Sequence, residues 1–221
     1  MRIGVIGAGN IGGNAANLLA RAGHEVLLSY SRDMDRLRAL ADEIGPAAKV
    51  GTPAEAAEFG EVVIISVPWR LVGDAAAQAG PLDGKIVIDT TNQFGRGLEP
   101  VPSGMTALQY NATRIPGARL VKSFNTLTAG FQASSAGRTG SDRVAMFYAG
   151  DDAEAKAVVA RLIEDAGFTA VDLGSAAEAL PMEAPRRPGG VYGEEYHLED
   201  ARAYVEAVRT GGPLPGPSVP D

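Results

Sequence analysis

The sequence predicts a doubly wound α/β fold, in which helices cover both faces of a mostly parallel sheet. Short apolar runs alternate with helical stretches over most of the 221 residues. Such alternation is typical of parallel strands joined by right-handed crossovers. The strands expected in the first half are apolar on both faces, which is typical of strands covered by helices on each side. We therefore expect one domain built around one sheet.

The elements follow in order along the chain. We expect strands at Ile3–Ile6, Glu25–Ser29, Val62–Val67, Lys85–Asp89, Arg119–Lys122, Val144–Ala149 and Thr169–Leu173. We expect helices at Asn10–Ala22, Met34–Ile44, Pro53–Glu58, Leu71–Ala79 and Ala153–Ala166. Between them, Gln93–Thr106 is a long loop rich in glycine and proline. Loops of that length in compact domains are usually functional.

The carboxyl-terminal stretch differs in composition from the rest. From about Gly174, prolines and glycines are frequent, followed by one short expected helix at Leu198–Val208. A Pro/Gly-rich end follows from Gly211, and we expect it to be flexible. The predicted boundaries are therefore residues 1–174 for the main domain and 175–221 for an irregular carboxyl-terminal extension.

Composition narrows the function classes. The formal net charge of −7 argues against partners such as nucleic acid or a membrane surface, which require clustered Lys and Arg. The chain has no cysteine and two histidines, so disulfides are excluded and no metal site is expected. No apolar run reaches the ~18–20 residues of a membrane helix, and the amino terminus passes straight into a strand with no secretory signal. We expect a soluble, cytoplasmic protein.

The strongest motif follows the first expected strand. The run Gly7-Ala8-Gly9-Asn10-Ile11-Gly12 lies between that strand and a helix, the context that makes a G-x-G-x-x-G pattern informative. Gly7 allows a tight turn, Gly9 allows close approach of a pyrophosphate, and Gly12 allows close packing of helix on strand. We assign Gly7, Gly9, Asn10, Ile11 and Gly12 to dinucleotide binding in a Rossmann-type fold. The alternative is a glycine-rich turn without a nucleotide.

The end of the second expected strand bears on which dinucleotide binds. An NAD site usually has Asp or Glu there, whereas this chain reads Ser31-Arg32. A guanidinium binds a 2′-phosphate with a fork of donors, and a serine hydroxyl adds another. This favours NADP(H), although Asp33 follows directly and keeps NAD possible. Alternatively, Arg32 is a solvated residue at a helix start.

Two further strand ends face the same crevice, because ligands bind at the carboxyl ends of parallel strands. We expect Val67, Pro68 and Trp69 to flank the adenosine or the nicotinamide ribose, with packing on the sheet as the alternative for Trp69. Asn92, with Thr91 before it, is expected on the nicotinamide side.

Several separated motifs together resemble one family. They are Gly7–Gly12, Gly23-His24-Glu25-Val26, Ser31-Arg32, Val67-Pro68-Trp69, Ser123-Phe124-Asn125-Thr126-Leu127 and Gly150-Asp151-Asp152. In this order, over residues 1 to about 174, they resemble the coenzyme F420-dependent NADP reductases and their relatives. The resemblance implies a Rossmann protein, often a homodimer, that passes a hydride between NADP(H) and a deazaflavin.

The resemblance also implies where the second substrate, a small-molecule hydride acceptor or donor, lies. It places Phe124, Thr126 and Leu127 beside that substrate. Asn125 is the one candidate catalytic residue, through a hydrogen bond to a carbonyl or carboxamide; the alternative is that it caps the loop backbone. Lys122 can act as an acid if a carbonyl or imine is reduced, or else is solvated.

The extension departs from the family pattern. Arg186 and Arg187 can bind an anionic substrate or be surface charge. Tyr192, Tyr196 and His197 can offer a proton or fix the extension to the body of the protein. No separate substrate domain is expected, so the substrate pocket is shallow or is completed by a second subunit. The leading hypothesis is an oxidoreductase that transfers hydride between NADP(H) and F420 or a flavin-like acceptor. The alternatives are a carbonyl or imine reductase and a non-catalytic NADP sensor.

Overall fold

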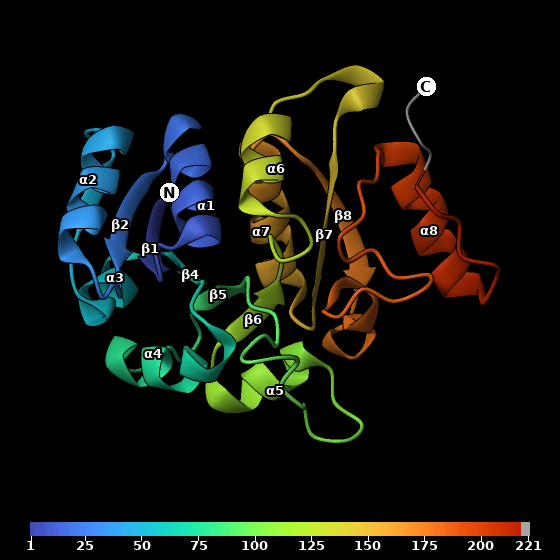
Figure 1. Cartoon of the computed structure of the whole chain (residues 1–221), viewed down its shortest axis with the longest axis horizontal. Coiled ribbons are helices and arrows are strands. Elements are labelled where there is room, and N and C mark those ends of the chain that lie inside the picture. Colours follow the sequence, from blue (N-terminus) through green and yellow to red (C-terminus); the bar gives the residue numbers. More distant parts are fainter. Residues whose placement is uncertain (218–221) are drawn as a thin grey trace.

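The computed structural model describes residues 1–217 and contains one eight-stranded sheet. Its strands lie in the order β3-β2-β1-β4-β5-β6-β7-β8 (Figure 1). Their bounds are β1 Arg2–Ile6, β2 Glu25–Ser29, β3 Ala48–Val50, β4 Val62–Ile65, β5 Ile86–Asp89, β6 Arg119–Lys122, β7 Ala145–Gly150 and β8 Thr169–Gly174. The order reverses between β1 and β4, which is where ligands bind in open α/β sheets.

Helices cover both faces of this sheet, as Figure 1 shows. Those that pack on one core cluster are α1 Asn10–Arg21, α2 Met34–Ile44, α6 Ala129–Ser135 and α7 Ala153–Asp165. Those of the opposite face are α3 Pro53–Phe59, α4 Val72–Ala79, α5 Ala107–Arg114 and α8 Leu198–Thr210. The predicted doubly wound Rossmann-type fold is confirmed.

Side-chain caps fix where several helices begin. Thr52 and Glu55 form a reciprocal capping box at α3, with Pro53 in its first turn. Thr106 and Gln109 do the same at α5. Asp152 accepts a hydrogen bond from the backbone N–H of Ala155 at α7. Such caps satisfy amide donors that the helix itself leaves unpaired.

Three elements were not expected from the sequence. β3 has only three residues, too few to show a strand pattern. α6 contains a glycine and two serines, which are weak helix formers. α5 follows the long loop directly, and its Thr106–Gln109 capping box was the signal that could have revealed it.

One pairing in the sheet is antiparallel, so that β7 and β8 run opposite to the other six strands. β7 pairs with β6 in the antiparallel direction, through Val121 opposite Gly150 and Lys122 opposite Ala149. β8 then pairs with β7 in parallel. Alternation of helix and strand could not reveal this reversal, because β7 is reached through the long loop 136–144 rather than directly from a helix.

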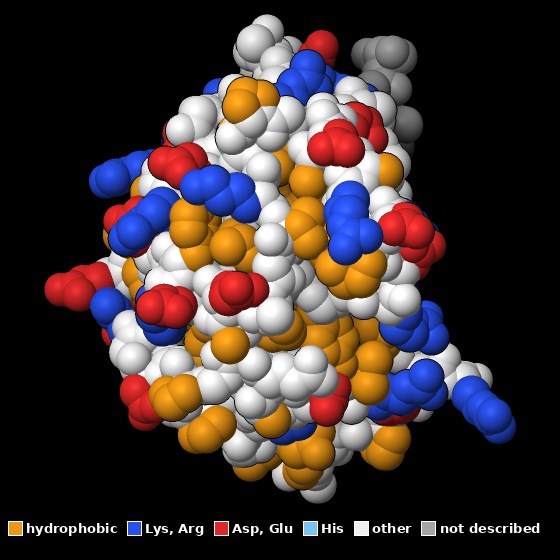
Figure 2. Space-filling view, turned by 90° about the vertical axis from the view of Figure 1, so that its left-hand side faces the viewer, with side chains coloured by type: hydrophobic (Ala, Val, Ile, Leu, Met, Phe, Trp, Pro, Cys, Tyr) orange, Lys and Arg blue, Asp and Glu red, His pale blue; other side chains and the backbone are white. Residues whose placement is uncertain are grey.

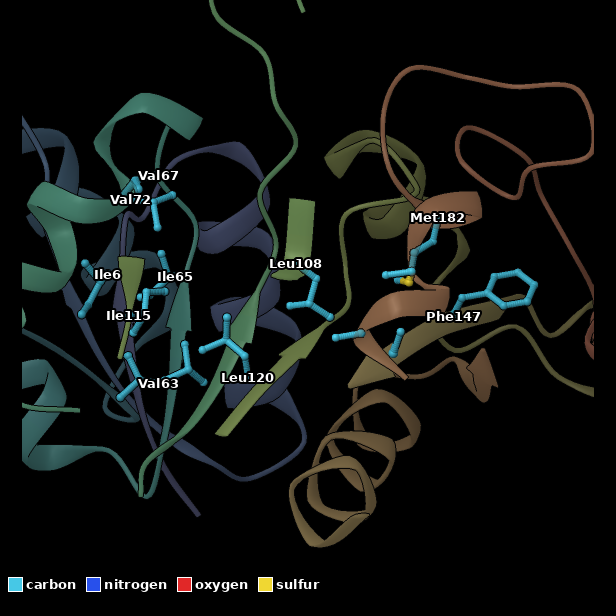
Figure 3. Packing of buried hydrophobic residues seen from close by; sticks show 14 of the residues in the cluster. Ile6, Val63, Ile65, Val67, Val72, Leu108, Ile115, Leu120, Phe147 and Met182 are labelled. Carbon is cyan, nitrogen blue, oxygen red and sulfur yellow. The ribbon is translucent and has the colours of Figure 1, made fainter. Parts of the chain in front are cut away.

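The core on the α4–α5 face extends from β1 and β4 to the carboxyl-terminal extension. Figure 3 shows side chains of β1 and β4 in the same cluster as Leu108 of α5, Phe147 of β7 and Met182. Because Met182 is fully buried here, the extension packs on the main domain as part of one continuous core.

Aromatic side chains fix the rest of the extension. Tyr196 and Tyr204 are buried and contact Phe147 edge-on, with ring centroids 5.5 and 6.0 Å from it. The hydroxyl of Tyr196 donates to the carbonyl oxygen of Pro215, and that of Tyr204 to Gly189. Tyr196 therefore fixes the extension to the body of the protein, which is the alternative named for it. The expected flexible end begins at Gly211; residues 211–217 are described, and 218–221 lie outside the described residues.

The surface is mixed in charge. On the face shown in Figure 2, acidic and basic side chains are interspersed with hydrophobic ones. Within the described residues, no helix is long and apolar enough to cross a bilayer. The same part of the chain contains no cluster of three or more His, Cys, Asp or Glu that could hold a metal ion.

Candidate functional site

The glycine-rich loop between β1 and α1 is built as the motif predicts. Gly7 has a φ of +100°, and a Cβ there would lie 2.4 Å from the carbonyl oxygen of Ser66. A Cβ on Gly12 would lie 2.2 Å from the carbonyl oxygen of Gly7. A Cβ on Gly9 would meet nothing within 4 Å. Gly7 and Gly12 are thus required by the fold, whereas Gly9 leaves open space in front of the helix.

That space lies before the amino terminus of α1. The first intrahelical bond runs from the N–H of Gly13 to the carbonyl of Gly9, so the preceding N–H groups have no partner within the helix. Asn10 and Ile11 line the cavity in front of them. A helix amino terminus with free N–H groups favours a bound phosphate.

A cavity of about 980 Å³ extends from this loop past the ends of β2 and β3. Ser31 and Arg32 line it, as the sequence predicts for a 2′-phosphate site. Arg36, Arg38 and Arg70 line it as well, and sequence reasoning missed them. Arg36 was detectable, since it lies one helical turn after Arg32 at the start of α2.

Two of the four arginines that line this cavity have side-chain partners, and two have none among the described residues. Arg38 pairs with Asp35 at 3.0 Å, and Arg36 donates to Asn10 at 3.5 Å. Within residues 1–217, Arg32 and Arg70 have no hydrogen-bond or ion-pair partner, and both are exposed. Two free guanidinium groups in one cavity favour an anionic ligand.

Asp33 and Glu55 also line this cavity, and one oxygen of the Asp33 carboxylate is engaged as a helix cap. Its Oδ1 accepts the N–H of Arg36 at 3.0 Å and caps α2. The hydroxyl of Ser31 donates to the carbonyl oxygen of Asp33 and accepts from its N–H. Before them, Tyr30 has a φ of +57° and donates from its hydroxyl to Asp74. Burial and the Asp74 carboxylate raise the pKa of Tyr30 to about 12.

A second cavity, of about 810 Å³, adjoins the first. The two share Gly9, Ser66, Val67 and Pro68 in their walls. The second cavity is lined further by the ends of β5 and β6, by α6 and by the extension, through Thr90, Thr91, Asn92, Asn125, Thr126, Leu127, Thr128, Phe131, Tyr192, Gly193 and Glu195. The carboxyl ends of four neighbouring strands therefore open onto one continuous hollow.

Trp69 lies on the border of this cavity but is 2 % exposed. The guanidinium of Arg114 stacks over its ring at 4.1 Å, and Tyr110 packs beside it with centroids 5.9 Å apart. Trp69 therefore packs within the protein, which is the alternative named for it, at the edge of the second cavity.

Asn92 and Asn125 form a pair that joins the strand ends to the extension. Asn92 donates to the carbonyl oxygen of Asn125 at 2.9 Å, and the Asn125 amide donates to Asn92 Oδ1 and to the carbonyl of Met182. Asn92 Oδ1 also accepts the N–H of Ala184. Within the described residues, Asn125 Oδ1 is buried without a partner. Asn125 thus fixes loop backbone, the alternative named for it, and retains one free acceptor.

The three residues expected beside the substrate are placed differently from one another. Thr126 and Leu127 line the second cavity. Phe124 does not: it is fully buried in the core on the α1 face. Its φ of +59° turns the backbone after β6 so that the ring points into the core. The placement of Phe124 against a substrate is therefore wrong.

Lys122 is not solvated, contrary to the alternative given for it. It is fully buried; its Nζ donates to Asp89 Oδ2 at 2.7 Å and to the carbonyl of Thr91 at 2.9 Å. Asp89 also accepts from Asn111 and from the backbone and hydroxyl of Thr91. Burial would raise the pKa of Asp89, but Lys122 and these hydrogen bonds outweigh it and lower the pKa. Lys122 is absent from the cavity wall and supports Thr91 from behind.

The extension supplies one wall of the second cavity from within the same chain. Tyr192, Gly193 and Glu195 line it, and the N–H of Gly193 donates to the carbonyl of Thr126. Burial raises the pKa of Tyr192, so its phenol stays protonated near neutral pH. Arg186 and Arg187 lie elsewhere: Arg186 pairs with Glu194, and Arg187 donates to nearby backbone carbonyls.

Comparison with known proteins finds a match for the amino-terminal part of the chain. Residues 2–93, which contain the glycine-rich loop and the first strand ends, match the family model described as "NADP oxidoreductase coenzyme F420-dependent". This part of the chain is similar to that family. The predicted recognition is confirmed. The family comprises oxidoreductases that use NADP.

Several known proteins are similar to this chain over a longer stretch. Metalloreductase STEAP3 of Rattus norvegicus is 30% identical over 183 residues, 83% of this chain and 36% of that protein. The chain thus spans about a third of that relative's length. A hypothetical protein from Sinorhizobium meliloti has a TM-score of 0.78 and 28% identity, covering 90% and 95% of the two chains. A "putative f420 dependent nadp-reductase" from Arthrobacter sp. FB24 has a TM-score of 0.68 and 25% identity over both full chains.

Proposed function

We propose that this chain is an NADP(H)-dependent oxidoreductase that exchanges hydride with a flavin-like or deazaflavin (F420) partner. The observation that carries the proposal is the joining of two unlike cavities at Gly9. One holds four arginines and suits a phosphorylated nucleotide; the other has no Lys or Arg in its described wall and suits a ring. A dinucleotide laid across the switch point would place its two ends in these two cavities.

The residues present fit NADP(H). Gly9 leaves a cradle that a side chain would fill, and the α1 amino terminus offers N–H groups for the pyrophosphate. Arg32, with Arg70 nearby, supplies unpaired guanidinium groups for a 2′-phosphate. Asp33, which would repel that phosphate, is engaged as a helix cap. When bound, the nicotinamide supplies hydride chemistry.

The chain's own contribution is orientation and exclusion of water. Val67 is buried, and Thr91 and Asn92 are held by the Asp89–Lys122 pair and the Asn125 amide. Asn125 Oδ1 offers an acceptor for a carboxamide or ring N–H. Tyr192 and Glu195 are the ionisable side chains among the described lining residues. Hydride exchange between stacked rings requires no dedicated acid, which suits this wall.

Two alternatives predict different results. Reduction of a carbonyl or imine needs a proton donor at the substrate. Lys122 is buried away from the cavity wall, so the protonated phenol of Tyr192 would have to donate that proton. A non-catalytic sensor would bind NADPH and turn over no acceptor.

The proposal is tested by titrating NADPH and NADH against wild type and Gly9→Ala, and by following NADPH oxidation with flavins and F420. We expect NADPH to bind more tightly than NADH. A Cβ at Gly9 meets open space in the protein, so Gly9→Ala should fold normally yet lose NADPH affinity severalfold. The proposal fails if wild type binds neither nucleotide; binding without turnover of any acceptor supports the sensor.

We further propose that the protein acts in the cytoplasm as a homodimer. The absence of cysteine suits a reducing compartment. The sheet ends at β8, whose outer edge pairs with no further strand among the described residues. Light scattering at working concentration should give about twice the 22.8 kDa of one chain; the mass of one chain would contradict the dimer.

A further inference from the structure

The second cavity has a distinctive charge pattern. None of its described lining residues is Lys or Arg, and Glu195 is the only Asp or Glu among them. The adjoining first cavity, by contrast, is lined by four arginines and two carboxylates, those of Asp33 and Glu55. The part of an acceptor that enters the second cavity therefore meets no cation in the wall to pair with a negative charge.

Glu195 forms an ion pair with Arg138, a residue outside this wall. Arg138 Nη1 lies 3.0 Å from Glu195 Oε1, and the side chains are 38% and 31% exposed. The same guanidinium lies over the ring of Phe131, 5.6 Å from its centroid, and Phe131 lines the cavity. His197 Nε2 is 3.6 Å from the same carboxylate oxygen. Glu195 is thus held against Arg138, which does not line the cavity itself.

The rest of the wall is aromatic. Phe94, from the long loop after β5, and Tyr192, from the extension, contact each other with ring centroids 6.3 Å apart. Both line the second cavity, and Phe94 is 50% exposed. An exposed aromatic side chain at a cavity mouth offers a stacking surface for a planar ring.

We infer that the hydride partner is a flavin without an anionic substituent, and that the Arg138–Glu195 pair sets this charge preference. The inference rests on the proposed function. In the reaction, NADPH loses a hydride to the flavin, a proton from water completes the reduced flavin, and NADP⁺ is released. The flavin ring stacks on Phe94 and Tyr192. Glu195 repels an anionic substituent on the flavin, and Arg138 does not attract that substituent because its guanidinium is paired with Glu195.

Riboflavin and FMN test this, because they share one ring and differ by a phosphate. We would measure the Kd of each by flavin fluorescence with saturating NADP⁺ at low ionic strength, and kcat/KM with NADPH. Wild type should bind riboflavin more tightly than FMN. Glu195→Gln frees Arg138, so the preference should shift toward FMN by about fivefold, the effect of one near charge in water. Arg138→Gln should shift it the opposite way.

The control is Glu206→Gln, which removes the carboxylate of an exposed ion pair with Arg209 on α8 and should leave the ratio unchanged. The inference is overturned if wild type prefers FMN, or if the ratio is the same in wild type, Glu195→Gln and Arg138→Gln. It is also overturned if NADPH binds but no flavin does. Loss of NADPH binding itself would instead overturn the proposed function.

Discussion

Replacing Arg32 by alanine is expected to weaken NADPH binding roughly 10- to 100-fold, the range for loss of hydrogen bonds to a charged group. NADH binding should be unchanged, because NADH lacks the 2′-phosphate. Arg32 lines the nucleotide cavity and has no partner among the described residues, so its removal disturbs no internal contact. Titration followed by the fluorescence of Trp69, the only tryptophan in the chain, measures both affinities.

Arg21 provides the matched control. It ends α1, is exposed, and is absent from the wall of either cavity. Arg21→Ala makes the same change in net charge and should leave the ratio of NADPH to NADH affinity as in wild type. If Arg32→Ala also leaves that ratio unchanged, Arg32 is a solvated helix-start residue and another group reads the phosphate.

Replacing Lys122 by methionine is expected to lower the free energy of unfolding by about 3–5 kcal/mol, the usual cost of leaving a buried charge uncompensated. Lys122 and Asp89 are 0% and 1% exposed. Met has a similar apolar length but donates nothing to Asp89. Because Asp89 positions Thr91, acceptor turnover should fall as well. Urea unfolding followed by circular dichroism measures the stability.

The Lys122→Met effect should depend on pH in a defined direction. In the folded wild type the pKa of Asp89 is lowered, so this group stabilises the fold above its unfolded pKa of about 3.9. That stabilisation is lost as the pH falls below this value. Without Lys122, burial dominates and raises the pKa of Asp89, so the variant should lose stability at a higher pH than wild type.

The double variant Lys122→Met with Asp89→Asn is the control, since it leaves no buried charge. It should recover part of the lost stability. Equal stability of wild type and Lys122→Met would show that the pair contributes no net stabilisation.

Much of this molecule followed from local sequence signals. The G-x-G-x-x-G run between a strand and a helix indicated the nucleotide loop, and the observed roles of Gly7 and Gly12 are mechanical consequences of their missing side chains. Ser31-Arg32 indicated the adjoining cavity because strand ends in a parallel sheet share one edge. These predictions depend on neighbours in sequence and on general sheet geometry.

The rest depended on contacts between distant segments. Lys122 lies beside Asp89 only because β5 and β6 pair in that register, and from sequence alone it looked like a solvated strand end. Phe124 was misplaced because a positive φ in a residue other than glycine is not visible in a sequence. Glu195 reaches the cavity because the extension, which has no repeating pattern, folds back beside Thr126.

Because the extension folds back onto the second cavity, the proposed contacts with the nucleotide and with the acceptor come from separate stretches of the chain. The nucleotide contacts we propose lie mainly within residues 7–70, whereas Tyr192 and Glu195 belong to the carboxyl-terminal stretch. Under the proposed function, substitutions of Tyr192 or Glu195 are therefore expected to change the choice of partner ring while leaving the nucleotide contacts intact. The short segment 192–195 is then the part of the chain whose exchange between relatives is expected to transfer the choice of partner ring while keeping the nucleotide contacts.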